Sequence, residues 1–419
     1  MSSSYPIRPV DNSELPAFGR IGLQAFNSSW PADELLEFDR LVVEPERTLA
    51  AFDGERQVGT LLAYSFGLTV PGGTVAAAGI SSAAVLPSHR RRGILTALVS
   101  RQLADIAAAG EPVAALFASE AAIYGRYGYG QACDHYRFTV HRGDGRLLPL
   151  PYPGEETAGS LGIRLAEPKA AAAGMKAVYE TVRPQRPGMV TRHDGWWDLY
   201  LADPEFMRDG RSPLGCVIAE DPSRARGYAL YSVHGGWDAD GIPEHDLTVH
   251  ELVGTDPAAL AALWSDLLSR DLVGKVSMRM RPVDDPLPYL LADQRRARAR
   301  VSDGLWIRLV DVAEALRQRR YAASVDVVVE VSDSLLPSNE GRWRLRSGGL
   351  GDKEPTCERT AEAADIALPV AALGAAYLGG ARLGALARAG QLAELRPGAV
   401  AELSAAMLWD PAPWSPMMF

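Results

Sequence analysis

One stretch of the chain, residues 75–118, constrains the fold more than any other. Residues 75–85 are almost all small and apolar, as expected for a strand that is covered on both faces. After a basic turn, apolar residues recur at helical spacing at Ile94, Leu95, Leu98, Val99, Leu103 and Ile106. Residues 112–118 form a second apolar run of strand length. Strands that alternate with a helix in this way predict an α/β or α+β domain.

The length of 419 residues is too great for one compact domain. Hydrophobic residues make up 47% of the chain and charged residues 23%, which excludes a disordered protein and a coiled-coil rod. Further strands are expected at 48–52 and 58–66. The proline-rich segment 148–154 is typical of a linker, so we expect a first domain over residues 1–150.

The middle of the chain repeats the order of elements seen in the first part. Strands are expected at 217–220, 227–232 and 247–253, followed by a helix over 257–268. The same order in both halves indicates an internal duplication. We therefore expect a second domain over residues 151–305.

A third domain is expected over residues 306–419. Strands are predicted at 324–331 and 341–345, and the alanine-rich residues 361–387 favour a helix. Chain termini are usually polar and frayed. This one is apolar, with Trp409, Trp414, Met417 and Phe419, so we expect folding to bury it.

Charge and cysteine spacing limit the partners of the chain. The formal net charge of −9 repels phosphate backbones, so no nucleic-acid partner is expected. No apolar run approaches the ~18 residues of a membrane span, and the first residues lack a signal-peptide pattern. We therefore expect a cytoplasmic protein without a membrane partner. Cys133, Cys216 and Cys357 lie far apart without metal-ligand spacing, so no metal site is expected.

The basic turn at residues 85–95 is the candidate ligand site. Amide groups at a helix start lack internal partners and attract anions, Gly93 lets a ligand approach the backbone, and Arg90, Arg91 and Arg92 add donors. This combination suits a pyrophosphate, but from these residues alone a solvated basic turn is an equal alternative. The corresponding turn of the second domain, 254–257, has an aspartate and no arginine. We expect the second domain to be structural.

The surroundings of this turn resemble a known family. A strand, an arginine-rich turn and a helix resemble motif A of the GNAT acetyltransferases, although Leu95 stands where a small residue is usual. The segments 88–95, 113–120, 123–130 and 303–306, together with the terminal Phe419, resemble the enhanced intracellular survival (Eis) acetyltransferases. The resemblance covers nearly the whole chain.

The resemblance implies an α/β (α+β) architecture of two GNAT-like domains in tandem and a C-terminal sterol-carrier-protein-like domain, in a homohexamer. It implies that only the first domain binds acetyl-CoA. The implied acetyl-CoA contacts are Ala83, Ala84, Val85, Arg91, Arg92, Gly93, Ile94, Leu95, Thr96, Ser119 and Glu120.

The resemblance also implies two catalytic groups. Transfer of the acetyl group leaves a thiolate that needs a proton, and a tyrosine can supply it. Tyr124, Tyr127 and Tyr129 share one glycine-rich segment and would otherwise be read as turn or core residues; only the resemblance selects Tyr124 as proton donor. It assigns the proton-acceptor role to the carboxylate of Phe419. The alternative is that the apolar tail fills a groove or an oligomer contact.

The implied function is acetyl-CoA-dependent N-acetylation of a small-molecule amine, either aminoglycoside-like, a polyamine or a lysine. The alternative is a lipid or sterol carrier that binds CoA incidentally. The acceptor is open, because several positions depart from the acidic and aromatic pattern of family members that acetylate aminoglycosides. These positions are Asn27, Ser28, Ser29, Phe38, Ser82 and Met418. Acidic residues at Asp33, Glu34 and Glu37 either compensate or form a solvated helix face.

Overall fold

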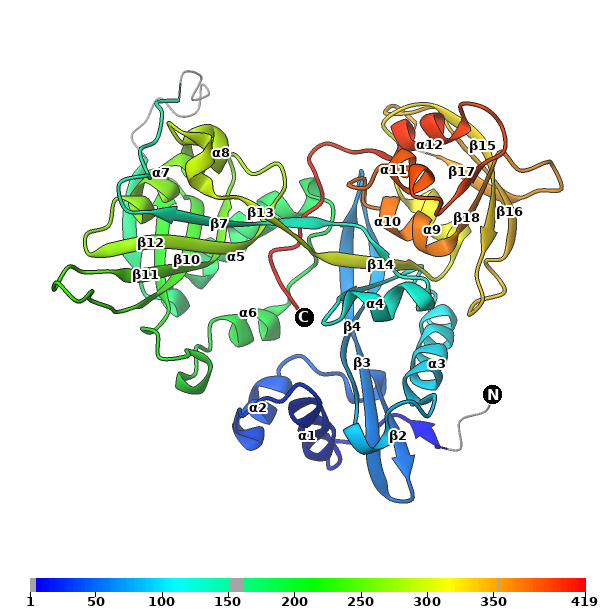
Figure 1. Cartoon of the computed structure of the whole chain (residues 1–419), viewed down its shortest axis with the longest axis horizontal. Coiled ribbons are helices and arrows are strands. Elements are labelled where there is room, and N and C mark those ends of the chain that lie inside the picture. The colour runs from blue at the N-terminus through cyan, green and yellow to red at the C-terminus, as the bar shows by residue number, and fades with distance from the viewer. Residues whose placement is uncertain (1–4, 151–160, 353) are drawn as a thin grey trace. The chain divides into compact units, whose positions relative to one another are not determined.

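The computed structural model describes residues 5–150, 161–352 and 354–419. Within these ranges the chain forms three β-sheets with helices packed on them (Figure 1). It divides into two compact units. The first contains the chain up to Cys133, Pro187–Trp196 and Gly304–Phe419, and the second contains Asp134–Arg186 and Trp197–Asp303. Residues 1–4, which belong to the segment searched for a signal-peptide pattern, lie outside the described residues. So does most of the predicted linker.

The first sheet contains the strands of residues 75–118, the stretch that most constrains the fold. Its strands, in spatial order, are β1 (Ile7–Arg8), β2 (Thr48–Asp53), β3 (Arg56–Val70), β4 (Gly73–Val85), β5 (Val113–Phe117), β14 (Leu305–Leu309) and β6 (Gly130–Gln131). Only β4 and β5 pair in parallel, and helix α3 (Ile94–Ala108) connects them. The predicted strand–turn–helix–strand unit is confirmed.

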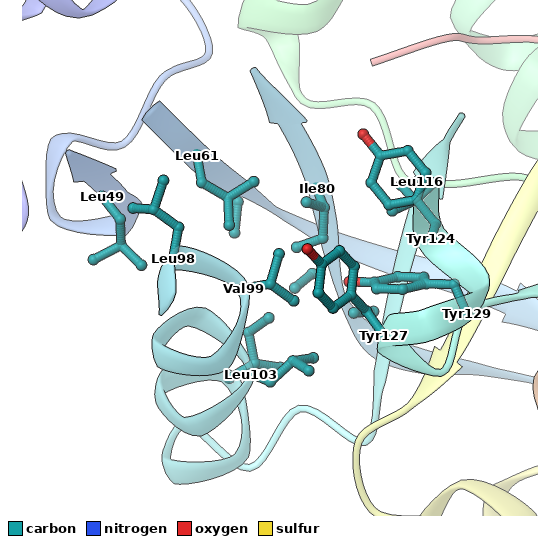
Figure 2. Close-up of a cluster of buried hydrophobic side chains, with 14 of the residues drawn as sticks. Leu49, Leu61, Ile80, Leu98, Val99, Leu103, Leu116, Tyr124, Tyr127 and Tyr129 are labelled. Atoms are coloured by element: carbon teal, nitrogen blue, oxygen red, sulfur yellow. The ribbon is translucent and has the colours of Figure 1, made fainter. Parts of the chain in front are cut away.

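Helices pack on this sheet and share a buried core with its strands. Helix α3 buries Leu98 and Leu103 in one core with Leu61 of β3 and Ile80 of β4 (Figure 2). Helix α1 (Leu15–Ala25) packs on β3 and β4 and also contacts α2 (Ala32–Asp39). Short helix α4 (Ala121–Tyr124) follows β5.

The second sheet repeats this arrangement. Its strands, in spatial order, are β13 (Arg300–Asp303), β7 (Asp134–His141), β12 (Val273–Pro282), β11 (His245–Gly254), β10 (Ala225–His234), β9 (Gly215–Glu220) and β8 (Gly162–Ala166). The helices of this part of the chain are α5 (Pro168–Val182), α6 (Asp194–Tyr200), α7 (Pro257–Leu268) and α8 (Leu287–Leu290). The only parallel pair of this sheet is β11 and β12, which α7 connects, as α3 connects β4 and β5.

Two strands do not follow chain order. Strand β7 lies within the predicted range 1–150, yet it pairs with β12 and β13 in the second sheet. Strand β14 lies at the predicted limit between 305 and 306, yet it pairs with β5 and β6 in the first sheet. Each strand buries its apolar residues there, so burial rather than chain order decides its sheet. The limits 1–150, 151–305 and 306–419 remain predictions about the chain and do not coincide with the sheets.

The third sheet belongs to the carboxyl-terminal part of the first unit. Its strands are β17 (Thr356–Arg359), β16 (Gly341–Ser347), β15 (Val325–Ser332), β18 (Ile366–Pro369) and β19 (Ala393–Glu394). The helices are α9 (Val312–Gln318), α10 (Val370–Ala376), α11 (Leu383–Arg388) and α12 (Ala399–Met407).

The prediction of a helix over residues 361–387 is wrong. Residues 366–369 form β18, which pairs in parallel with β15. Helix α10 starts only after Pro369, whose fixed φ suits a helix start but not a helix interior. It ends before Gly379, which adopts a φ of +90°. The high alanine content therefore led to a predicted helix that is too long.

Within the described ranges, the helices are all too short or too polar to span a bilayer. The same ranges contain no group of three or more histidine, cysteine, aspartate or glutamate side chains that could hold a metal ion.

Candidate active site

The site begins where strands β4 and β5 separate. Their parallel pairing runs from Ala77↔Val113 to Ile80↔Leu116 and stops there, although β4 continues to Val85. On its other edge β4 stays paired with β3, with a bulge at Ser82, which has a φ of 51° and whose carbonyl accepts a hydrogen bond from the Thr60 hydroxyl at 2.9 Å. Bulges of this kind commonly re-aim backbone groups beside a site. The last residues of β4 therefore present an edge that β5 does not occupy.

The amino-terminal end of helix α3 faces the same opening. Its N-cap residue is Gly93, which has a φ of +80° and provides no side-chain cap. A side chain added at Gly93 would meet nothing within 4 Å. The amide groups of the first helical turn thus lack a capping partner from the cap residue, as in helix termini that bind anions. This geometry favours a phosphate site over a merely solvated basic turn.

These elements enclose a cavity of about 690 Å³, which we call the cofactor cleft. Ten of the predicted cofactor contacts line it: Ala83, Ala84, Val85, Arg91, Gly93, Ile94, Leu95, Thr96, Ser119 and Glu120. Arg92 is not among the lining residues; its guanidinium donates a hydrogen bond to the Tyr5 hydroxyl at 3.0 Å. His89, Arg90 and Arg126 line the cleft as well, and Arg126 was not foreseen from the sequence.

The three tyrosines of the glycine-rich segment have different surroundings (Figure 2). The Tyr127 hydroxyl lies 3.2 Å from the Thr96 hydroxyl of α3, which ties this segment to the helix. Tyr129 is fully enclosed, and burial raises its pKa strongly. Tyr124 lines the cleft and hydrogen-bonds with the side chain of Ser119. Burial raises the pKa of Tyr124 above its ordinary value, and the hydrogen bond with Ser119 partly opposes the rise.

In the second sheet the matching helix start is blocked. The carboxylate of Asp256 caps α7 and accepts hydrogen bonds from the amides of Ala258 and Ala259. Arg226 pairs with this carboxylate at 2.9 Å and with Asp221 at 3.1 Å. An anion at this helix start would meet a carboxylate instead of free amides. That the second domain is structural remains a prediction.

The carboxyl terminus returns to the first sheet. The Phe419 ring packs against Phe66 at 4.9 Å and Phe117 at 5.4 Å between centroids. The Trp196 ring is tilted against that of Phe66 at 5.5 Å and meets the Tyr64 ring edge-on at 4.8 Å between centroids. We call these five residues the aromatic cluster. A Cβ at Gly79 would overlap the Phe66 ring and lie 3.0 Å from that of Phe419, so glycine makes room for the tail.

The rest of the tail is held in the same unit. The amide of Trp414 donates to the carbonyl of Pro187 at 2.7 Å, and Cys133 donates to the carbonyl of Pro413 at 3.2 Å. Trp414 and Met417 are buried, whereas Met418 is 63% exposed. The predicted burial of the apolar tail is confirmed for Trp414 and Met417, while Trp409 and Phe419 are only partly buried.

A second cavity, of about 410 Å³, lies among α1, α2, β3 and β4, and we call it the α1–α2 cavity. Its lining is mainly large and apolar: Leu15, Phe18, Leu23, Phe26, Trp30, Leu35, Leu36, Val43, Leu62 and Tyr64. Phe26 also lines the cofactor cleft. Ser82 lines this cavity while the next residue, Ala83, lines the cleft, so the two spaces adjoin at the β4 bulge.

The residues expected to determine which acceptor is bound do not all line the same cavity. Ser28 and Ser82 line the α1–α2 cavity, Asn27 lines the cofactor cleft, and Phe38 lines neither. The three acidic residues Asp33, Glu34 and Glu37 are exposed on α2 and do not line the cavity. They form the solvated face of that helix.

The carboxylate that does line this cavity, Asp39, was not predicted from the sequence. Burial raises the pKa of Asp39 to about 6. A signal existed, because Leu35 and Asp39 are spaced four residues apart in α2, which puts an acid on the same helix face as an apolar residue.

Comparison with known proteins assigns the sequence and fold to a class. Residues 6–132 and 188–309 each match a model described as an acetyltransferase (GNAT) domain, and residues 312–416 match a sterol carrier protein domain. The crystal structure of Eis1 from Mycobacterium abscessus superposes with a TM-score of 0.83 at 34% identity, covering 99% of this chain and 100% of that one.

Sequence relatives narrow the class. An uncharacterised N-acetyltransferase of Streptomyces avermitilis is 45% identical over 95% of both chains. The N-acetyltransferase Eis of Mycobacterium tuberculosis is 38% identical over 81% of this chain and 80% of its own. The chain therefore belongs to the Eis-type GNAT N-acetyltransferases. The predicted fold, two GNAT domains and a sterol-carrier-like domain, is confirmed, and so is the prediction of an acetyltransferase.

Proposed function

We propose that the chain transfers an acetyl group from acetyl-CoA directly to an amine in a ternary complex. The observation that carries the proposal is the cofactor cleft, where the open edge of β4, the uncapped start of α3 and Arg91 meet beside Tyr124. A pantetheine has amides that can pair with a strand edge, and a pyrophosphate suits a helix start with arginines. These residues fit acetyl-CoA.

Acetyl-CoA supplies the acetyl group as a thioester, and its thiol is the leaving group. We assign Ala83, Ala84 and Val85 to pairing with the pantetheine, and Arg91 to Thr96 to the phosphates; Arg92 retains this assignment as part of the turn. Ser119 and Glu120 bound the cleft at the end of β5.

Two groups move protons in this proposal. Tyr124 donates its hydroxyl proton to the departing sulfur, since it lines the cleft and carries this proton at neutral pH. The attacking nitrogen must first lose a proton, and we assign its acceptance to the α-carboxylate of Phe419. The contact of Phe419 with Phe66 and Phe117 supports this role, since it holds the terminus at the sheet that carries the cleft.

The test is to mix the protein with acetyl-CoA and single amines and to follow the release of free thiol. The panel contains an aminoglycoside, a polyamine, a lysine peptide and an arylalkylamine. We expect thiol release with at least one amine. If no amine releases thiol while the protein binds lipid tightly, the carrier alternative is correct instead.

A homohexamer, a cytoplasmic location and the lack of nucleic-acid or membrane partners remain predictions. Light scattering after size-exclusion chromatography measures the oligomeric state. A mass six times 45.1 kDa is the expected result.

A further inference from the structure

Asp39 is a carboxylate in an otherwise apolar space. It is the only aspartate or glutamate among the described residues that line the α1–α2 cavity, and the lining has no lysine, arginine or histidine. The nearby cations Arg20 and Arg40 are exposed and do not line the cavity. A charge in such a space costs free energy unless an opposite charge meets it.

No such partner exists within the described part of the chain. The Asp39 carboxylate makes no hydrogen bond or ion pair there, and burial is the only cause of its raised pKa. Gly19 of α1 lies beside the Asp39 carboxylate: a Cβ added at Gly19 would be 4.0 Å from one of its oxygens. The Asp39 carboxylate also helps to raise the pKa of Tyr64 of β3. The Asp39 carboxylate is therefore available to pair with a ligand bound in the cavity.

Asp39 is also connected to the cofactor cleft through neighbouring residues. Tyr64 hydrogen-bonds with the side chain of Ser81, which precedes the bulge residue Ser82. The bulge is where the α1–α2 cavity and the cofactor cleft adjoin, with Phe26 common to both. A molecule held by Asp39 would therefore lie next to the cleft.

The lining decides what kind of molecule this is. Phe18, Phe26, Trp30 and Tyr64 offer aromatic surface, which favours an apolar body and attracts an ammonium to ring faces. A second or third ammonium would enter an apolar space without a partner. One carboxylate and an aromatic wall match one positive charge on an aromatic body.

We propose that the α1–α2 cavity is the acceptor subsite and that it takes an arylalkyl monoamine, whose ammonium pairs with the Asp39 carboxylate. The role as acceptor rests on the proposed acetyltransferase function, whereas the binding of the cation does not. Polyamines and aminoglycosides are then poor ligands.

The test measures binding without acetyl-CoA, so it does not depend on turnover. The probes are 2-phenylethylamine and its neutral counterpart 2-phenylethanol, titrated calorimetrically at pH 7.5. We expect the wild type to bind the amine at least ~10-fold more tightly than the alcohol, as one ion pair in an apolar site would give. Asp39→Asn should remove this preference and leave the affinity for the alcohol unchanged.

Two further variants locate the effect. Asp33→Asn makes the same change on the exposed face of α2 and should keep the full preference. Gly22 lines the cavity with open space at its Cβ position, so Gly22→Leu should fill the cavity without a clash and abolish binding of both probes, while acetyl-CoA binding persists.

The contrary results are distinct. An unchanged preference in Asp39→Asn, or tighter binding of spermidine than of 2-phenylethylamine by the wild type, would overturn the inference. Failure of every amine to release thiol, with the preference intact, would instead contradict the proposed function and leave the cation site standing.

Discussion

At the scale of single residues, the site depends on two polar groups inside apolar surroundings. Tyr124 is buried yet lines the cofactor cleft, and its hydroxyl has Ser119 as partner. Asp39 is half-buried without a partner in the described chain. Burial favours the neutral form of each, so the first keeps the proton that the proposed transfer needs, and the charged form of the second depends on a ligand cation.

The Tyr124→Phe variant tests the proton donor. It removes one hydroxyl and almost no volume, so the affinity for acetyl-CoA should survive while kcat falls by roughly 10²-fold or more. The matched control is Tyr127→Phe, whose lost hydroxyl contacts Thr96 instead. If the control loses as much turnover as Tyr124→Phe, the assignment of Tyr124 is wrong.

Asp39 should link stability to pH with a definite sign. Its pKa in the folded chain, about 6, is above the ordinary value of 3.8, so the folded state prefers the protonated form. Stability from this group is complete below the ordinary pKa and is lost as the pH rises through about 6. Asp39→Asn should therefore raise Tm at pH 7.5 and have little effect on Tm at pH 3.5 in thermal scans.

The same titration should govern ligand binding in the opposite direction. The affinity for 2-phenylethylamine should fall as the pH drops from 7.5 to 5, because protonation removes the charge of Asp39. An affinity that is constant over this range would exclude Asp39 as the partner of the ammonium.

At the scale of elements, the start of α3 differs from the start of α7. Gly93 leaves the α3 amides free, whereas Asp256 occupies those of α7. The same strand–helix–strand arrangement is thus open to an anion in one sheet and closed in the other. The difference lies in a single cap residue and its neighbours.

A pair of substitutions at Gly93 tests the helix start. Asparagine and aspartate have the same size, and both tolerate a positive φ better than most residues, so they differ mainly in charge. Gly93→Asp should weaken acetyl-CoA binding at least ~10-fold relative to Gly93→Asn, from repulsion of the phosphates. Equal dissociation constants for the two folded variants would count against a phosphate site.

At the scale of the whole molecule, residues distant in sequence complete the first unit. Phe419 and Trp196 meet on β3, and β14 fills the sheet between β5 and β6. Arg308 of β14 pairs at 2.7 Å with Asp333, which follows β15, and both side chains are almost fully buried. The third sheet is therefore joined to the first sheet through a buried ion pair.

The carboxylate of Phe419 can be removed without touching its side chain. Amidation of the terminus, by protein ligation, should leave folding and acetyl-CoA binding intact and abolish most turnover. Full turnover in the amidated protein would mean that the tail only fills the space beside Phe66 and Phe117. Extension beyond Phe419 should also inactivate, since it displaces the carboxylate.

The buried ion pair should matter far more than a surface pair. Asp333→Ala leaves the guanidinium of Arg308 buried without its charge partner, at a cost of about 3–5 kcal/mol in the free energy of unfolding. The exposed pair of Arg342 and Glu330 provides the control, since Glu330→Ala should cost less than about 1 kcal/mol. Denaturant titration measures both, and similar losses would contradict this view of the interface.

The sequence alone determined the local units and the family. Periodicity identified β4, α3 and β5, because a strand and a helix each bury a face with their own spacing. The basic turn with Gly93 indicated an anion site, and ten of the residues carried over from the family line one cleft. Composition failed at residues 361–387, where β18 pairs with a distant strand despite the many alanines.

Only the tertiary structure decided which distant residues meet. Strand pairing moved β7 and β14 into sheets that chain order did not indicate, because a strand gains its hydrogen bonds and burial from whichever edge is free. The α1–α2 cavity and its lone carboxylate depend on α1 and α2 packing beside β3, so the spacing of Leu35 and Asp39 could suggest a shared helix face, but only the structure shows that Asp39 lines a cavity while the other acids of α2 are exposed. Charge is visible in a sequence, but its cost depends on burial, which only folding supplies.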